Sequence, residues 1–349
     1  MFRNCCLLLL PLLAALRGHS QAPEYAAGGA FHLGSFITKM SKADVLKDSY
    51  SSFVQGEWSA STPLSARTRL GATLLHGNSG GKRYLGTVSA ALGFADRPLL
   101  GHRAWRLHGR LAAGLGWIGK PYDPETNFKN TLLGSHLNAA VQLSVYQELR
   151  IGRHWSWNSG VSFLHLSNGL STLPNLGLNI PALHTGVLYR WAAPPMPQGA
   201  ADSLPDGRNR WQLWASAGLK QWPLVNSRRH LVSVLSIEWH RYTLRGSSWG
   251  AQAQVLRDAS PNAPTDSTLK APGAGGFAAA LGAHYTPRIG RLEIPLQAGV
   301  YVFNRRDSNR VYQSLGIRYR VARRWRAGIQ LKTHMGKADY FHAGIGYEW

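Results

Sequence analysis

The chain ends on FHAGIGYEW, residues 341–349, and this stretch decides between the possible fold classes. Phe, Ala, Ile, Tyr and Trp alternate in it with His, Gly and Glu. Successive side chains of a β-strand point to opposite faces, so this alternation predicts a strand with one apolar face. The spacing polar-x-Gly-x-x-aromatic-x-aromatic, formed from His342 to Trp349, occurs again in HTGVLYRW at 184–191.

Alternation recurs along the chain in stretches of about ten residues with turn residues between them. Clear examples are 69–75, 84–94, 231–240 and 312–320. After residue 22 no apolar stretch approaches the roughly 20 residues that a spanning helix needs, and a 3.6-residue period is almost absent. Repeated alternation of this kind predicts a transmembrane β-barrel. A soluble β-sandwich, which also alternates, is the alternative.

The terminal spacing favours the barrel over the sandwich. It resembles the terminal strand signal that the barrel-assembly machinery of Gram-negative outer membranes reads, which implies that this machinery is a partner during insertion. We predict an all-β protein, a transmembrane antiparallel β-barrel, integral to the outer membrane of a Gram-negative cell. The strands number about sixteen, with about 12 to 16 plausible, each near the ~9–11 residues that a tilted strand requires.

The connections between the strands should differ in length at the two ends of the barrel. If the N-terminus is periplasmic, connections after odd-numbered strands face outward and are longer. The longer connections are 37–47, 119–132, 169–179 and 257–273, and short turns lie near 62–63, 152–153, 245–246, 287–288 and 322–323.

The repeated spacing divides the chain into two related halves of about eight strands. A Pro-rich connection at 192–209 separates the first half, 23–191, from the second, 210–349, like a linker. The halves close as one large barrel or as two small ones. One barrel leaves fewer strand edges to satisfy in lipid, so we favour it.

The first 22 residues have the layout of a secretory signal peptide. Arg3 precedes an apolar run at 7–16, and the small-x-small ending predicts cleavage after Ala22. Cys5 and Cys6 both lie in this segment. The mature chain therefore has no thiol, which excludes disulfides, cysteine metal sites and thiol catalysis.

A His-x-Ser pair in FLHLSNGLSTLPNLGLN, 163–179, is the candidate for chemistry. The strand that precedes the loop places Val161, His165 and Ser167 on one face. We expect His165 and Ser167 to face lipid near the external boundary, where ionisable groups are functional candidates. About 6.6 Å of strand rise separates the two residues, so an imidazole nitrogen can reach the serine oxygen.

The segment HLSNG at 165–169, followed by PNLG at 174–177, resembles the active-site segment of the outer-membrane lipid A 3-O-deacylases, a family of acyl hydrolases. The stretches 120–127 and 134–143 also look like longer members of this family, and the match is best over 110–191. The resemblance implies a barrel whose catalytic residues face the outer leaflet and hydrolyse an ester of lipid A, the lipid part of lipopolysaccharide.

The resemblance also implies a role for each residue of the segment. Ser167 is the nucleophile, and His165 is the general base that removes the hydroxyl proton. Asn168 and the backbone N–H groups of Asn168 and Gly169 stabilise the oxyanion, and one such donor can be worth about 3 kcal/mol of barrier.

The third member of the triad departs from the family pattern. The family places a Glu on the next strand, and Asn179 stands at that position here. An amide oxygen can fix the imidazole tautomer, but it cannot stabilise the imidazolium as a carboxylate does. Two alternatives stay open: Asn179 is a plain turn residue, or another carboxylate, such as Glu148, takes its place.

Two further polar residues stand close to this segment in the expected barrel. His136 and Asn138 share a face of the preceding strand, close enough to support the pair, with ordinary lumen residues as the alternative. The remaining histidines are scattered, so we predict no metal and no cofactor.

The second half carries a changed copy of the segment. Thr333-His-Met-Gly-Lys337 occupies the place of 164–168, and Gly336 stands where the serine would be. The second half therefore cannot carry the same chemistry.

The formal net charge of +22 is strongly basic. No nucleic-acid-binding fold accompanies it, so we predict no nucleic-acid partner. Arginine binds phosphate through its planar fork, which suits lipid A and other anionic outer-membrane lipids. The main hypothesis is a serine hydrolase that cleaves an ester-linked acyl chain from lipid A. The alternative is a non-catalytic structural or transport barrel in which the His-Ser pair is inert.

Overall fold

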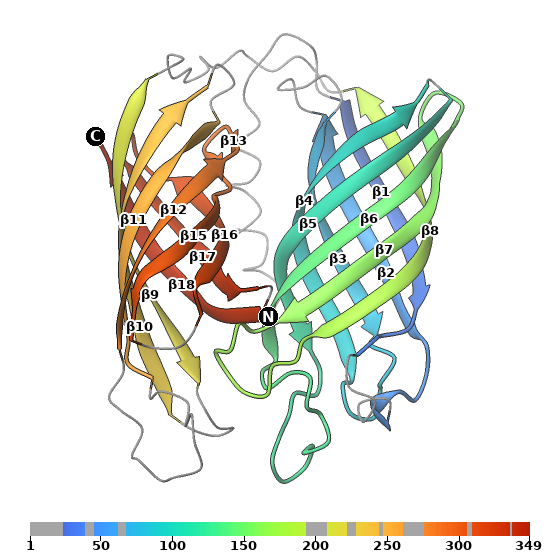
Figure 1. Cartoon of the computed structure of the whole chain (residues 1–349). Helices are drawn as coiled ribbons and strands as arrows, with labels where there is room; N and C mark the ends of the chain where they lie inside the picture. The colour runs from blue at the N-terminus through green and yellow to red at the C-terminus, as the bar shows by residue number, and fades with distance from the viewer. Residues whose placement is uncertain are drawn as a thin grey trace. The chain divides into compact units, whose positions relative to one another are not determined.

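The structure is a computed structural model that describes residues 24–38, 45–61, 68–102, 104–192, 208–221, 228–243, 247–260, 276–305, 309–335 and 337–349. The expected signal peptide at 1–22 and most of the Pro-rich connection at 192–209 lie outside these residues. The chain divides into two compact units, and each is a closed antiparallel barrel (Figure 1). Within the described ranges, no helix is long and apolar enough to cross a membrane.

The first barrel has eight strands in chain order, drawn from blue to green in Figure 1. They are β1 (Glu24–Gly34), β2 (Ser51–Ser61), β3 (Arg69–Asn78), β4 (Thr87–Gly101), β5 (Trp105–Ile118), β6 (Leu137–Ile151), β7 (Trp155–Ser167) and β8 (Leu178–Ala192). β8 pairs with β1 and closes the ring, so every strand has two neighbours. The connections after odd strands are the longer ones, as predicted: 35–50, 79–86, 119–136 and 168–177. We call this end of the first barrel the loop end.

The second barrel, drawn from yellow to red in Figure 1, repeats this plan. Its long strands are β9 (Asn209–Gln221), β10 (Arg229–Tyr242), β11 (Ser248–Asp258), β12 (Phe277–Thr286), β15 (Leu296–Asn304), β16 (Val311–Arg320), β17 (Trp325–His334) and β18 (Lys337–Glu348). β18 pairs with β9 and closes the ring. Two short strands, β13 (Arg288–Ile289) and β14 (Leu292–Glu293), extend the sheet beside β16.

The predicted all-β barrel fold, with about sixteen strands in two related eight-stranded halves, is confirmed. The preference for one large barrel is wrong. Each half pairs its own last strand with its own first strand. Both edges are therefore satisfied within each half, and the argument from free edges does not favour a joint barrel.

The alternation read from the sequence corresponds to the two sides of the barrel wall. In β10, Leu231, Leu235 and Ile237 are exposed on the outer face, whereas Val232 and Glu238 point inward and are buried. An apolar outer face and a largely polar interior are what an outer-membrane barrel requires.

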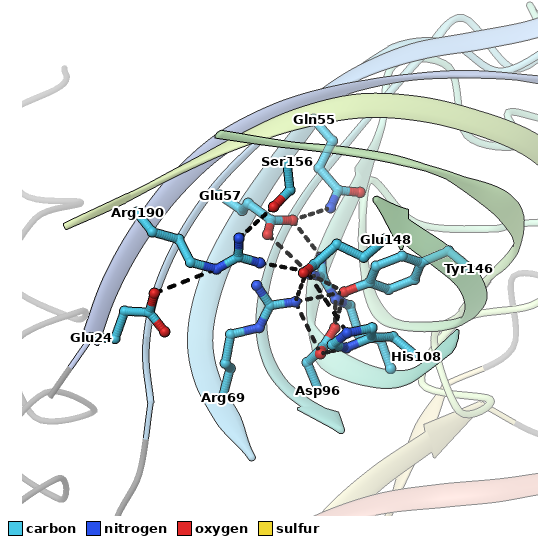
Figure 2. A network of polar contacts seen from close by, with 11 residues as sticks. Glu24, Gln55, Glu57, Arg69, Asp96, His108, Tyr146, Glu148, Ser156 and Arg190 are labelled. Carbon is cyan, nitrogen blue, oxygen red and sulfur yellow. Dashed lines mark hydrogen bonds and ion pairs between the residues drawn. The ribbon is translucent and has the colours of Figure 1, made fainter. Parts of the chain in front are cut away.

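A network of ion pairs fills the first barrel near its short turns (Figure 2). Its buried ions are three cations and three acids, namely Arg69, Arg110, Arg190, Glu57, Asp96 and Glu148. Glu24, which is exposed, lies 3.9 Å from Arg190 Nε at the margin of the network. Asp96 accepts hydrogen bonds from Arg110 Nε at 3.0 Å and from Arg69 Nη2 at 3.2 Å, and it also receives the Tyr146 hydroxyl. The charges balance, which is what buried ions require.

The loop end of the same barrel is apolar inside. Its buried cluster contains strand residues and residues of the long connections: Phe53, Leu75, Val88, Ile118, Leu164, Leu166, Leu178 and Ile180 from the strands, and Phe36, Leu46, Leu85, Leu132 and Leu133 from the connections. The connections are thus packed onto the barrel interior. This packing gives the residues at the loop end a rigid base.

Candidate active site

The expected orientation of the His-Ser pair on β7 agrees with the structure. Ser162, Leu164 and Leu166 point into the barrel and are buried, whereas His165 and Ser167 alternate with them on the outer face. His165 is half-buried, and Ser167, whose hydroxyl is bonded to Asn175 of the 168–177 connection, is only 7% exposed. Both residues therefore belong to the lipid-facing side of the wall, at the loop end.

His165 is held by the next strand. Its cross-strand partner on β8 is Asn179, and His165 Nδ1 lies 2.7 Å from Asn179 Oδ1. Cross-strand partners have neighbouring side chains on the same face, so the sheet register itself brings the two groups together. The position that the sequence suggested for a triad acid is thus occupied by an acceptor for Nδ1.

Ser167 is held by the connection that follows it. Its hydroxyl donates to Asn175 Oδ1 at 3.2 Å, and Asn175 Nδ2 donates to Ser167 Oγ at 3.0 Å. The same Asn175 oxygen accepts the backbone N–H of Asn168 at 3.0 Å. No role was predicted for Asn175 from the sequence. Its only signal there was the Pro174-Asn175-Leu-Gly177 turn.

The turn at Gly177 fixes the connection against the imidazole. Gly177 has φ +78°, a region that favours glycine, and its N–H donates to Leu132 O at 3.0 Å. A Cβ built on Gly177 would meet His165 Cε1 at 2.9 Å. The backbone of this turn therefore lies directly against the ring, and only glycine fits the space.

Asn168 is bound on the side of the β5–β6 connection. It is 2% exposed, and its Nδ2 donates to Ser135 Oγ at 3.0 Å. Gly169, the next residue, has φ +58°. The chain thus turns sharply just after the serine, at the two residues expected to stabilise an oxyanion.

The expectation that His136 and Asn138 share a face is wrong. Asn138 is buried, and its amide donates to Ser135 O and His136 O, both at 3.0 Å. His136 precedes β6, is exposed, and stacks on Trp117 with 4.8 Å between ring centroids. Because the chain bends at His136 and β6 begins only at Leu137, simple alternation does not extend back to His136.

The alternative carboxylate, Glu148, lies elsewhere. It is buried in the ion network of Figure 2, where Arg190 Nη2 and Arg69 Nη2 lie 2.5 Å and 3.3 Å from its Oε2. That network surrounds the end of β6 near the short turns, whereas His165 lies at the loop end. Glu148 therefore does not replace Asn179.

The second barrel brings together three possible metal ligands that the sequence analysis took to be scattered. Glu238, His240 and His284 are buried, and their ligand atoms all lie within 4.8 Å of one another. However, Arg318 holds both Glu238 oxygens, at 2.6 Å and 2.7 Å. The carboxylate is therefore already paired with a cation.

The changed copy of the segment is also placed differently from the prediction. His334 points into the second barrel, where it is 8% exposed and its Nε2 lies 2.9 Å from the Tyr301 hydroxyl. Gly336 lies outside the described residues. His334 thus occupies the inward face that Leu164 occupies in the first barrel, not the outer face of His165. The alignment of the two segments from sequence is wrong by one residue.

Two models of known protein families match the chain. The family model described as lipid A 3-O-deacylase (PagL) matches residues 49–187, and the acyloxyacyl hydrolase C-terminal domain matches residues 209–349. A comparison with curated proteins finds no match.

The solved structures that are similar to the chain share little sequence with it. The translocator domain of the autotransporter NalP from Neisseria meningitidis is 10% identical, with 99% of this chain and 95% of that one covered and a TM-score of 0.20. The siderophore receptor PirA from Pseudomonas aeruginosa is 9% identical, with 95% and 81% covered and a TM-score of 0.20. TM-scores this low carry no argument, so the assignment rests on the two family models, which between them match both barrels. The chain belongs to the lipid A 3-O-deacylase family of outer-membrane proteins.

Proposed function

We propose that the chain is an outer-membrane serine hydrolase that removes an ester-linked acyl chain from lipid A, with Ser167 as nucleophile and His165 as base. The observation that carries the proposal is the 2.7 Å contact between His165 Nδ1 and Asn179 Oδ1 on the outer face of the wall. An ordinary lipid-facing surface has no reason to hold an oriented imidazole beside a serine.

The contact with Asn179 selects the tautomer of His165. An amide oxygen only accepts hydrogen bonds, so Nδ1 carries the hydrogen and Nε2 is the basic nitrogen. Nε2 takes the proton of the Ser167 hydroxyl while Oγ attacks the ester carbonyl carbon. The proton then passes to the departing lipid hydroxyl, which leaves an acyl group on Ser167. Water, activated in the same way, releases the fatty acid and restores the serine.

Amide donors surround the serine for the developing oxyanion. Asn175 Nδ2 lies 3.0 Å from Ser167 Oγ, and the backbone N–H of Asn168 donates to Asn175 Oδ1. A substrate carbonyl that displaces the Asn175 oxygen receives the Asn168 N–H in its place. Donors fixed before the reaction lower its barrier because they need no reorganisation.

The surroundings suit a substrate with several acyl chains. Exposed apolar side chains cover the wall on both sides of the pair: Leu115, Leu137, Leu143, Val161, Leu183 and Val187. Lipid chains can lie along this surface while an ester near the headgroup reaches Ser167. Outer-membrane lipids and the barrel-assembly machinery remain the other proposed partners.

The test replaces Ser167 with alanine and reads lipid A from expressing cells by mass spectrometry. We expect the wild type to remove an ester-linked chain and Ser167→Ala to lose at least about a thousandfold in rate. The matched control is Ser159→Ala, which changes a serine on the same face of β7 and should keep full activity. Continued loss of the acyl chain in folded Ser167→Ala would remove this serine from the mechanism.

The alternative, a structural or transport barrel, is disfavoured by the filled interiors. Side chains fill the interior of eight-stranded barrels. The interior of the first barrel is blocked by both the network of Figure 2 and the apolar cluster at the loop end. Steady conductance in planar bilayers, together with unchanged lipid A in wild-type cells, would favour the alternative.

A further inference from the structure

A hollow lies at the loop end of the first barrel, beside the candidate active site. It has a volume of about 700 Å³ and is formed by the β3–β4 and β5–β6 connections. Its walls combine basic and aromatic side chains, namely Arg83, Lys120, Lys129, Tyr84, Tyr122 and Phe128.

Hydrogen bonds between the two connections build the hollow in advance. Asn127 Nδ2 donates to Tyr84 O at 2.8 Å and to Pro121 O at 2.7 Å. Asn130 Nδ2 donates to Lys120 O at 2.8 Å, and the Lys120 N–H donates to Leu85 O at 3.0 Å. A site whose walls are tied together before binding loses less entropy when a ligand enters.

In the part of the chain that the structure describes, no acid forms an ion pair with the cations of the hollow. Among the described residues, Arg83, Lys120 and Lys129 form no ion pair; Arg83 Cζ and Lys129 Nζ instead lie 5.3 Å and 5.6 Å from the centre of the Tyr84 ring. Tyr84 thus holds two positive groups at the hollow without cancelling their charge.

The acid that lines the hollow is used by its own loop. Asp123 Oδ1 accepts the Thr126 N–H at 2.7 Å, the Thr126 hydroxyl at 2.8 Å and the Glu125 N–H at 3.0 Å. These donors, Thr126 first, hold the pKa of the Asp123 carboxyl below its usual value. The carboxylate is therefore engaged in shaping the loop, and the cations outnumber it.

The hollow is linked to the surroundings of Ser167 through the end of the β5–β6 connection. His136 lines it, and the preceding residue, Ser135, accepts the hydrogen bond from Asn168 through its Oγ. Trp117, stacked on His136, is exposed on the outer wall. A molecule with its acyl chains along the wall and an ester at Ser167 therefore has its polar part beside this hollow.

We infer that the hollow binds a phosphorylated sugar of the lipid A headgroup, with Arg83 and Lys129 as its phosphate ligands. The inference rests on the proposed function, because the lipid is the substrate assigned there. Guanidinium and ammonium groups bind phosphate oxygens through charge-assisted hydrogen bonds. Headgroup binding at this position fixes which ester reaches Ser167, since the distance from phosphate to ester is set by the sugar.

The experiment measures binding without turnover, using the full chain with Ser167→Ala in detergent micelles. Bisphosphorylated lipid A and enzymatically dephosphorylated lipid A are the two probes. We expect the bisphosphorylated lipid to bind at least about tenfold more tightly. Adding Arg83→Gln and Lys129→Gln should abolish that preference. Lys120 is left unchanged because its Nζ also donates to Arg83 O at 3.2 Å.

The matched control adds Arg150→Gln and Arg153→Gln, two exposed cations at the short-turn end of the same barrel, and should keep the preference. Equal binding of the two lipids, or a preference that survives Arg83→Gln/Lys129→Gln, would overturn the inference. Displacement of the lipid by a modest excess of inorganic phosphate would show a free-phosphate site instead and would also overturn it. Binding is read in a background that cannot hydrolyse, so these outcomes are separate from any failure of Ser167 as nucleophile.

Discussion

The last two strands of both barrels carry the same aromatic pair, but the residues that follow along these strands differ. In the first, Trp155 of β7 and Tyr189 of β8 are cross-strand partners whose ring centroids lie 5.0 Å apart with planes at 61°. In the second, Trp325 and Tyr347 are partners at 5.1 Å and 65°. The same aromatic pair thus joins the last two strands of each barrel, at the start of β7 and of β17, where amphipathic rings suit the membrane boundary.

Counting along the strands from these two tryptophans brings out the difference. His165 then corresponds to Met335, which is 76% exposed, and Leu164 corresponds to His334. A shift of one residue moves a strand side chain to the opposite face, so His334 points into the lumen of the second barrel. The proposed chemistry therefore depends on one face of one strand and its loop, not on the barrel plan.

The interiors differ as well. The first barrel has one connected ion network and a large apolar cluster above it. In the second, the ion pairs among the described residues fall into groups around Glu238, Glu348 and Lys220, and the apolar cluster is small. Among the described residues, the larger apolar cluster therefore belongs to the barrel that carries the candidate site.

The largest expected difference between the barrels is in activity. His165→Ala should lower the rate of lipid A deacylation by about a thousandfold or more, because no base remains for Ser167. His334→Gln, which keeps a hydrogen-bonding partner for Tyr301, should leave the rate unchanged. Rates are measured on purified protein in detergent with lipid A as substrate. Equal losses in the two variants would mean that the second barrel takes part in the chemistry.

A smaller difference is expected in stability. Asp96→Asn leaves the three buried cations of the first network with two buried acids, Glu57 and Glu148, and the uncompensated buried charge costs about 3–5 kcal/mol. Glu293→Gln in the second barrel should cost about 1–2 kcal/mol, because Arg326 retains Glu348 at 2.9 Å. The free energy of unfolding in urea, followed by tryptophan fluorescence, measures both. Equal costs would show that the connected network adds nothing over isolated pairs.

The sequence predicts the barrel fold and the outward face of the site because both follow from a two-residue period. The alternation at 231–240 gives the wall, and the parity of β7 places His165 and Ser167 outside. The closing spacing at 184–191 and 342–349 marks the two rings, although edge counting alone pointed to one. The number of barrels is decided by the pairing of the first and last strands within each half, which alternation does not encode.

Features that depend on loops or on depth in the lumen could not be read in this way. Asn175 reaches Ser167 because Gly177 turns the chain toward Leu132, a long-range contact without a sequence pattern. His240 and His284 lie on different strands. The two-residue period gives the face of each side chain but not its position along the barrel axis. The inward position of His334, in contrast, follows from the alternation of β17 counted from Trp325, and matching the two segments by their letters missed it.

The departure at Asn179 offers the next prediction. Asn179→Asp keeps the length of the side chain, so a carboxylate oxygen takes the place of the amide oxygen 2.7 Å from His165 Nδ1. A carboxylate stabilises the imidazolium that forms when Ser167 attacks. We expect the rate to rise by about ten- to a hundredfold, and Asn179→Ala to lower it. A rate that falls in Asn179→Asp would show that the amide is adapted to this site.

The smallest expected effect separates positioning of the imidazole from backbone strain. Gly177→Ala places a methyl group 2.9 Å from His165 Cε1, so the ring must move, and we expect the rate to fall by about tenfold. Gly152→Ala, in a short turn, meets a similar φ of +73° but has open space around its Cβ. Both changes strain the backbone by about 1 kcal/mol, so both lower the thermal stability to a similar degree. Only Gly177→Ala should lower the rate, and it should do so in kcat more than in KM, because the ring serves the reaction rather than the binding of lipid. A similar fall in kcat for Gly152→Ala would mean that strain anywhere in the first barrel reaches the site, and the 177 turn would then have no special part in holding the base.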